Sequence, residues 1–171
     1  KVGFNYTART DLDLAEVKVQ LLHNTEPGFA DSPSSLASPL YSDCISVSNQ
    51  ITDGRYGLTT EFLWGDGVNG RPDVSGFSVM PTYSFSEKLQ WVGTFEVAAS
   101  HEENGVILPL RYEALSPGVG DKSGDAYFAG YSGLNYYING HNFKLMSGVK
   151  YSYLNGGRGG GDFNGWTWLA G

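Results

Sequence analysis

The chain of 171 residues has one cysteine and little positive charge, and it has no long hydrophobic run. The single cysteine, Cys44, excludes an intrachain disulfide and a zinc site built from several cysteines. The formal net charge of −7 argues against nucleic acid as a partner, because phosphate binding needs a basic surface. Without a run of about 18 apolar residues, the sequence contains no transmembrane helix.

Signatures of catalysis are also missing. Residues 101–104, His-Glu-Glu-Asn, lack the second histidine of a zinc protease, and the glycine-rich residues 156–161 lack the Lys-Ser/Thr of a phosphate loop. No nucleophile-elbow serine is present, and residues 66–73 lack the spacing of an EF-hand calcium loop. We therefore expect no enzymatic activity, no metal site and no cofactor.

Glycine and aromatic residues are abundant instead, with 24 glycines, 11 tyrosines and 4 tryptophans, as suits an all-β protein with many turns. Alternation of apolar and polar residues predicts nine strands. Pro81 falls on the apolar side of its strand, so we expect a bulge or weak pairing there. The predicted strands are residues 1–8, 15–22, 43–52, 55–65, 74–86, 89–100, 126–138, 143–155 and 163–171.

The strand over residues 143–155 shows the alternation clearly. Leu145, Val149 and Tyr151 fall on one face, whereas Lys144 and Lys150 fall on the other. In a soluble β-sandwich the apolar face would point to the core, and in a membrane barrel it would point to lipid. This strand by itself is compatible with both.

The connectors favour the barrel, because short turns alternate with long loops along the chain. All tight turns then lie at one end and all long loops at the other, as in bacterial outer-membrane barrels. The tight turns are expected at residues 53–54, 87–88 and 139–142, and long loops at residues 25–42, 66–73 and 101–124. We predict an all-β, antiparallel, up-and-down transmembrane β-barrel in the bacterial outer membrane.

Nine strands is an odd number, whereas single-chain bacterial barrels have an even one. If the last strand runs toward the periplasm, the first strand does too, so at least one more strand is expected before Lys1. Residues 1–171 are therefore interpreted as a single β-barrel domain that is incomplete at its N-terminus.

Residues 133–146, Gly-Leu-Asn-Tyr-Tyr-Ile-Asn-Gly-His-Asn-Phe-Lys-Leu-Met, resemble the phosphate-selective porin O and P family of outer-membrane porins. Residues 111–115, Arg-Tyr-Glu-Ala-Leu, and 73–77, Asp-Val-Ser-Gly-Phe, are similar to the same family. The resemblance implies the C-terminal half of a sixteen-stranded, trimeric porin that is embedded in outer-membrane lipid. Small hydrophilic solutes, including anions such as phosphate, are expected to diffuse through its lumen. Family barrels end in an aromatic residue, so a few residues are expected beyond Gly171, and the basic ladder of phosphate-selective members is not visible here.

Strand parity places several charged side chains on the polar face, which would line the pore. Together with Lys1 and Glu16 they are slightly basic in sum, and rings of like charge set pore selectivity, so a weak preference for anions is predicted. The alternative is that they are solvated side chains that pair across strands. The pore-lining candidates are Lys18, Arg55, Glu61, Glu96, Lys144 and Lys150.

The long connector over residues 101–124 contains Val-Ile-Leu-Pro-Leu at 106–110, which is too apolar for a freely solvated loop. We expect it to fold into the pore as a constriction or to pack against a neighbouring subunit. An extra strand pair turned at residues 103–105 is the other option. The constriction candidates are Leu108, Pro109, Arg111 and Glu113.

Two other functions remain compatible with the sequence. The first is a non-conducting barrel that anchors a surface layer or a larger complex. The second is a secreted β-sandwich that binds carbohydrate or protein, with aromatic residues as a sugar platform instead of a membrane girdle.

Overall fold

A computed structural model of the chain describes residues 2–8, 14–23, 41–68, 71–107, 123–139, 143–156 and 162–171. These residues form β-strands, turns and bends, with no α-helix among them and hence no helix that could cross a membrane. All further statements about the structure refer to these ranges.

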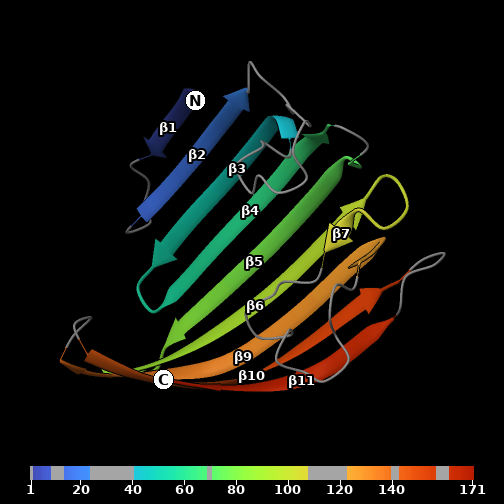
Figure 1. The fold of residues 1–171 in the computed structure, drawn as a ribbon. Coiled ribbons are helices and arrows are strands. Elements are labelled where there is room, and N and C mark those ends of the chain that lie inside the picture. The colour runs from blue at the N-terminus through green and yellow to red at the C-terminus, as the bar shows by residue number, and fades with distance from the viewer. Residues whose placement is uncertain are drawn as a thin grey trace.

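Nine strands form one antiparallel sheet in which neighbours in the sheet are also neighbours in the chain (Figure 1), apart from a separate pair, β7 and β8, between β6 and β9. Strand β1 pairs with β2 and β11 pairs with β10, and β1 and β11 do not pair with each other, so the described sheet is not closed. The bounds are β1 Val2–Ala8, β2 Leu14–His23, β3 Tyr41–Asp53, β4 Tyr56–Gly67, β5 Val74–Ser84, β6 Leu89–Ser100, β7 Val106–Ile107, β8 Ser123–Gly124, β9 Ala126–Asn139, β10 Phe143–Asn155 and β11 Phe163–Ala170.

The predicted all-β, up-and-down order is confirmed, and β6 and β10 have the predicted bounds. The turn between β3 and β4 is shifted by one residue, from the predicted 53–54 to Gly54 and Arg55. Gly54 has φ of 55°, a left-handed conformation that costs glycine little, and this fixes the turn.

Pro81 weakens pairing without a bulge. Paired residues of β5 and β6 stop at Val79 with Phe95 and resume in the same register at Thr82 with Val92. On its other side, Pro81 remains opposite Leu58 of β4. Because proline has no N–H to donate, the ladder toward β6 is interrupted locally while the alternation of faces is preserved.

The strand register aligns the apolar and polar positions of each strand with those of its neighbours. Opposite residues of neighbouring strands lie on the same face, so each face is built from rows that cross β2 to β10. One apolar row consists of Val19, Val47, Phe62, Phe77, Val97, Phe128 and Tyr153. The adjacent row on the other face consists of Lys18, Ser48, Glu61, Ser78, Glu96, Ala129 and Ser152.

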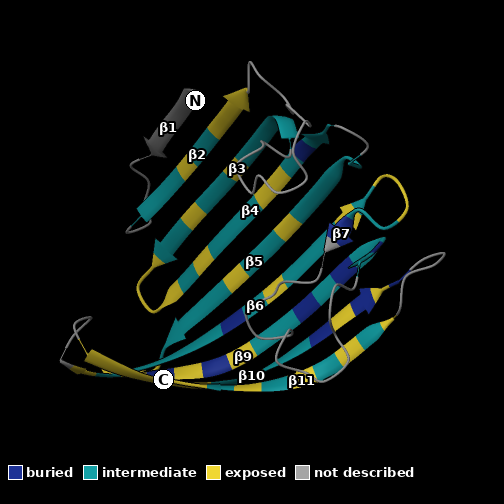
Figure 2. Cartoon of the chain, viewed as in Figure 1, coloured by how far each residue is buried: buried dark blue, intermediate teal, exposed yellow. Residues whose placement is uncertain are grey.

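The sheet curves like an open trough (Figure 1), and buried residues alternate with less buried ones along β9 and the end of β10 (Figure 2). We name the face of the row with Phe77 the outer face and the face of the row with Glu61 the inner face. Four apolar side chains of the described residues are buried, Val106, Tyr127, Ala129 and Leu154, with Ala98 and Phe163 packed against them. The last three buried side chains lie on the inner face of β9 and β10, where β7 covers them.

A strand pair, the second option for this connector, is present, but its pairing differs from the hairpin considered. A turn does occur at residues 103–104, where Asn104 has φ of 61°. However, Val106 of β7 pairs with Gly124 of β8, at the far end of the connector, so the pair is not a hairpin turned at 103–105. The reason is packing, because Val106 joins the inner core and this places β7 against the sheet wall.

Candidate functional site: the inner face of the sheet

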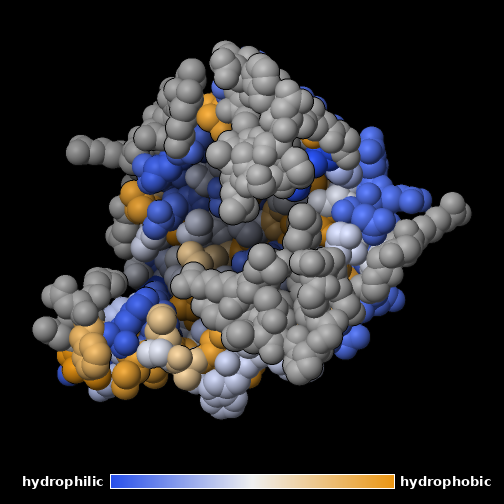
Figure 3. Space-filling model, in the orientation of Figure 1, coloured by the Kyte–Doolittle hydropathy of each residue, from blue (hydrophilic) through white to orange (hydrophobic). Residues whose placement is uncertain are grey.

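The inner face encloses a hollow of about 520 Å³ near the turns that join β3 to β4 and β5 to β6. Figure 3 shows the molecule hollowed at its centre, on the inner side of the trough. Six strands, β3 to β6, β9 and β10, contribute residues to this hollow, and hydroxyl and amide groups predominate among the polar side chains. They include Thr59, Thr82, Gln90, Asn135, Tyr137 and Lys144.

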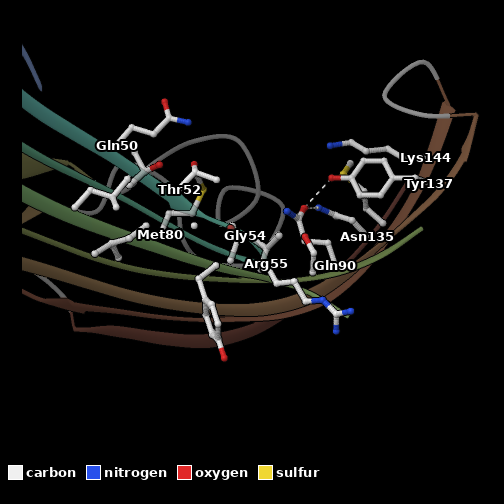
Figure 4. A pocket seen from close by; sticks show the side chains of 18 of the residues that line it. Gln50, Thr52, Gly54, Arg55, Met80, Gln90, Asn135, Tyr137 and Lys144 are labelled. Atoms are coloured by element: carbon white, nitrogen blue, oxygen red, sulfur yellow. Dashed lines mark hydrogen bonds between the residues drawn. The ribbon is translucent and has the colours of Figure 1, made fainter. Parts of the chain in front are cut away.

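Three of these side chains form a hydrogen-bonded cluster (Figure 4). The Tyr137 hydroxyl donates to Gln90 Oε1 over 2.7 Å, and Asn135 Nδ2 donates to the same oxygen over 3.3 Å. The strand register produces the cluster, because Gln90 of β6 lies opposite Asn135 of β9. Sequence reasoning did not select these residues as a site: alternation placed Gln90 on the polar face of its strand, but Tyr137 was expected among the aromatic residues of a girdle.

Tyr131 occupies the wall of the hollow beside this cluster. Its ring fills the space left by two glycines, Gly133 and Gly148, which are opposite each other in β9 and β10. A Cβ atom added to Gly148 would lie 2.5 Å from Tyr131 Cε2 and Oη, and one on Gly133 would also collide with the ring. The two glycines therefore allow the aromatic ring to lie against the strand backbones.

The charged residues predicted to line a pore are distributed along the inner face and form no single cluster. Lys18, Glu61 and Glu96 share one row, with Ser46 Oγ donating to Glu61 Oε1 over 2.9 Å. Lys18 Nζ lies 2.8 Å from a carboxylate oxygen of Glu16 two residues away on the same strand. The parity that the sequence predicts for these residues agrees with the register.

Two lysines of β10 lie on the same face at different heights. Lys150 Nζ is 5.9 Å from the centre of the Tyr127 ring, near the buried core. Lys144 lines the hollow at the turn end. Arg55 lies in the exposed turn between β3 and β4 and also lines the hollow (Figure 4).

The described strands consequently carry a balanced set of charges on the inner face. Three are basic and three are acidic. The slight basic excess expected from the sequence depended on Lys1, which lies outside the described residues, and on Arg55. The residues are Lys18, Lys144, Lys150, Glu16, Glu61 and Glu96.

The constriction candidates Leu108, Pro109, Arg111 and Glu113 lie outside the described residues. The two ends of their segment are described, and both are attached to the wall. Val106 packs into the inner core, and Asp125, just after β8, donates its backbone N–H to the Asn155 carbonyl over 2.8 Å. The segment is thus anchored at the inner face near the end of the sheet opposite the tight turns.

Gly124 makes the closest approach of this segment to the sheet. A Cβ atom there would collide with the Asn155 carbonyl oxygen and lie 2.8 Å from its carbon. Since backbone atoms cannot rotate away as a side chain can, we expect Gly124→Ala to displace β8 and to cost about 1–3 kcal/mol in unfolding free energy.

Gly130→Ala is the matched control, because a Cβ at Gly130, in the following strand β9, would meet nothing within 4 Å. Urea unfolding of both variants measures the difference. Equal stabilities of the two alanine variants would contradict the close contact between β8 and β10.

The outer face carries aromatic side chains near the tight turns. The Tyr56 and Tyr83 ring centres are 4.9 Å apart, and Tyr83 and Phe85 are 5.1 Å apart. Trp91 Nε1 donates to Ser132 Oγ over 3.0 Å at the same end of the sheet. These rings form an aromatic band on the outer face of β4, β5 and β6 near the tight turns.

In the described part of the chain, no group of three or more His, Cys, Asp or Glu side chains could hold a metal ion. Comparison with known proteins adds no identification: no family model, no curated protein and no solved structure matches the chain.

Proposed function

We propose that the chain forms part of the wall of a water-filled β-barrel in the bacterial outer membrane, through which small hydrophilic solutes diffuse. One observation carries the proposal, the exposure of large apolar side chains on the outer face. Only four apolar side chains of the described residues are buried. The exposed ones on the outer face include Val17, Leu21, Val47, Leu58, Phe62, Phe77, Phe95, Leu134, Leu145, Val149, Trp166 and Trp168.

Lipid accounts for this surface better than water does. Monomeric proteins in water rarely expose contiguous apolar patches of more than a few hundred Å². In a sandwich the same face would be covered by a second sheet, and no described segment covers it. Four large apolar residues, Leu22, Leu63, Met80 and Met146, are exposed on the inner face, whose other apolar side chains include the buried inner core.

Strand lengths agree with a membrane span. Strands β3 to β6, β9 and β10 contain 11 to 14 residues each, and a tilted strand needs about 9–11 to cross the hydrocarbon core. The excess places the strand ends in the interfaces, where the aromatic band near the tight turns would lie. The resemblance to trimeric porins extends the proposal to a homotrimer.

The mechanism is passive. Solutes cross a water-filled lumen whose wall charges and folded-in segment set charge and size selectivity. Three basic and three acidic strand residues line the described inner face, and Arg55 adds one positive charge at the hollow. We therefore expect this part of the wall to discriminate only weakly between small anions, phosphate included, and cations.

Single-channel conductance of the full-length protein in a planar bilayer tests the proposal. We expect large, steady current steps and, under a salt gradient, a reversal potential close to zero. Heat-modifiable migration on a gel without any conductance would retain the barrel and move the function to anchoring. A protein that neither inserts nor conducts would overturn the proposal.

Removing inner-face carboxylates should shift the selectivity. Glu61 and Glu96 lie in one row with only Ser78 between them, so Glu61→Gln with Glu96→Gln leaves an excess of positive charge on the wall. We expect the reversal potential to move toward the chloride equilibrium potential. Glu87→Gln, in the exposed turn between β5 and β6, is the control and should leave the potential unchanged.

A further inference from the structure

The wall of the hollow combines an aromatic surface with uncharged hydrogen-bonding groups. Tyr131 lies against the wall over Gly133 and Gly148, so the ring is supported from behind and its other side faces the hollow that it lines. A ring held in this way cannot collapse toward the strands. It presents a fixed apolar surface about the size of one sugar ring.

The polar groups lie next to this surface. Gln90 lies opposite Asn135. Two residues farther along β6 and two residues back along β9, Val92 lies opposite Gly133. Two residues along a strand correspond to about 7 Å. The cluster of Gln90, Asn135 and Tyr137 therefore lies within reach of a molecule that rests on the Tyr131 ring.

The cluster also has bonding capacity to spare. Gln90 Oε1 accepts from both Tyr137 and Asn135, which fixes the two amides in place. Within the described part of the chain, the Gln90 side-chain nitrogen and the Asn135 side-chain oxygen have no other partner. A donor and an acceptor thus lie side by side, which suits the hydroxyl groups of a ligand because each hydroxyl both donates and accepts.

We propose that this part of the inner face is a binding subsite for a small saccharide. The apolar C–H face of a pyranose ring rests on Tyr131, and its hydroxyls bind the amides of Gln90 and Asn135. The hollow of about 520 Å³ is in the range of small-molecule sites. The proposal deepens the diffusion function and rests on it, since it names a solute class for the same channel.

Lys144 at the edge of the hollow widens the class to acidic sugars. A single flexible ammonium group gives a carboxylate one partner, whereas a bare phosphate is held better by several donors in a fixed arrangement. Neutral and acidic sugars share a polyhydroxylated ring. A neutral probe and an acidic probe therefore distinguish between the two classes.

Isothermal titration of the full-length protein in detergent measures binding without requiring conduction. Maltose, glucuronate and inorganic phosphate are the probes. We expect maltose and glucuronate to bind with millimolar affinity and phosphate not to bind measurably. Binding of glucuronate alone would show that Lys144 is essential, and Lys144→Gln should then abolish it.

Three variants test the aromatic surface. Tyr131→Leu should weaken saccharide binding about tenfold, whereas Tyr131→Phe retains the ring and should bind like the original protein. Gly148→Ala keeps Tyr131 but pushes its ring from the wall, so it should weaken binding similarly. Tyr153→Leu, on the outer face, is the control and should have no effect.

The outcomes separate the subsite from the channel. Conductance without saccharide binding, or binding that Tyr131→Leu leaves unchanged, overturns the subsite and leaves the channel intact. Saccharide binding in a protein that conducts no ions supports the subsite and removes the channel. In a conducting protein, maltose should also reduce the ion current, and Tyr131→Leu should relieve that block.

Discussion

Arginine in place of Phe77 is expected to destabilise the protein in lipid by about 2–4 kcal/mol, the cost of a cationic side chain near the middle of a barrel's lipid face. Phe77 is 42% exposed on the outer face, between Phe62 and Val97. If this face contacts hydrocarbon, the guanidinium must leave water. If it contacts water, the same exchange alters an exposed position and changes stability by no more than about 0.5 kcal/mol.

The neighbouring residue provides the control. Ser78 lies on the inner face between Glu61 and Glu96, so the side chain of Ser78→Arg would meet two carboxylates in a polar lumen. We expect that variant to unfold within about 0.5 kcal/mol of the original protein. Urea unfolding after refolding into lipid vesicles, followed by tryptophan fluorescence, measures both.

The comparison is informative because both substitutions introduce arginine at neighbouring positions of β5 that lie on opposite faces of the sheet. A large loss for Phe77→Arg with little loss for Ser78→Arg would mean that lipid contacts the outer face. Equal, small losses for the two arginine variants would contradict the membrane interpretation and favour an uncovered sheet in water.

The strands could be predicted from the sequence because apolar and polar residues alternate along each of them, one kind on each face of the sheet. In β10, Leu145 and Val149 alternate with Lys144 and Lys150, and this period of two fixes strand type and facing without tertiary information. Weak strand pairing at Pro81 could likewise be predicted, because any proline lacks the backbone N–H that a β-ladder needs.

Features that depend on contacts distant in the sequence could not be predicted. Val106 pairs with Gly124 across a long connector, and no local pattern specifies that partner. The support of Tyr131 by Gly133 and Gly148 requires the register of β9 against β10. Alternation predicts the face of the sheet on which a residue lies. Its side-chain contacts with other strands also depend on the register, which alternation does not specify.

The inner-face cluster shows a related limit. A search of the sequence for chemistry selects charged residues first, and Gln90 and Asn135 are ordinary polar residues in their own strands. They become a candidate site because the register places them opposite each other and Tyr137 binds the same oxygen as Asn135. Arg55 illustrates the other case, since its charge alone was enough to select it from the sequence, and it does line the hollow, from the turn between β3 and β4.

Alanine in place of Leu154 is expected to lower the unfolding free energy by about 2–5 kcal/mol, as for other large-to-small changes in a packed core. Leu154 has 0% of its surface exposed and packs with Val106, Tyr127 and Ala129 on the inner face. The loss should be independent of lipid, because the cavity opens inside the trough and not at the outer surface.

Part of the effect should be local to the segment that covers the wall. Since Val106 of β7 contacts Leu154's cluster, a cavity there weakens the attachment of the β7–β8 pair. We expect faster hydrogen exchange at the amides of Val106 and Gly124, which belong to that pair, than at the amides in the centre of β6. Leu145→Ala, on the same strand but 50% exposed on the outer face, is the control and should cost less than half as much.

The two exchanges in β10 also connect stability with transport. If β7 and β8 hold the connector inside the channel, Leu154→Ala should increase single-channel conductance while Leu145→Ala leaves it unchanged. A destabilised protein with unaltered conductance would mean that the inner core serves stability alone. An unaltered stability of Leu154→Ala would contradict the packing of β7 on the inner face itself.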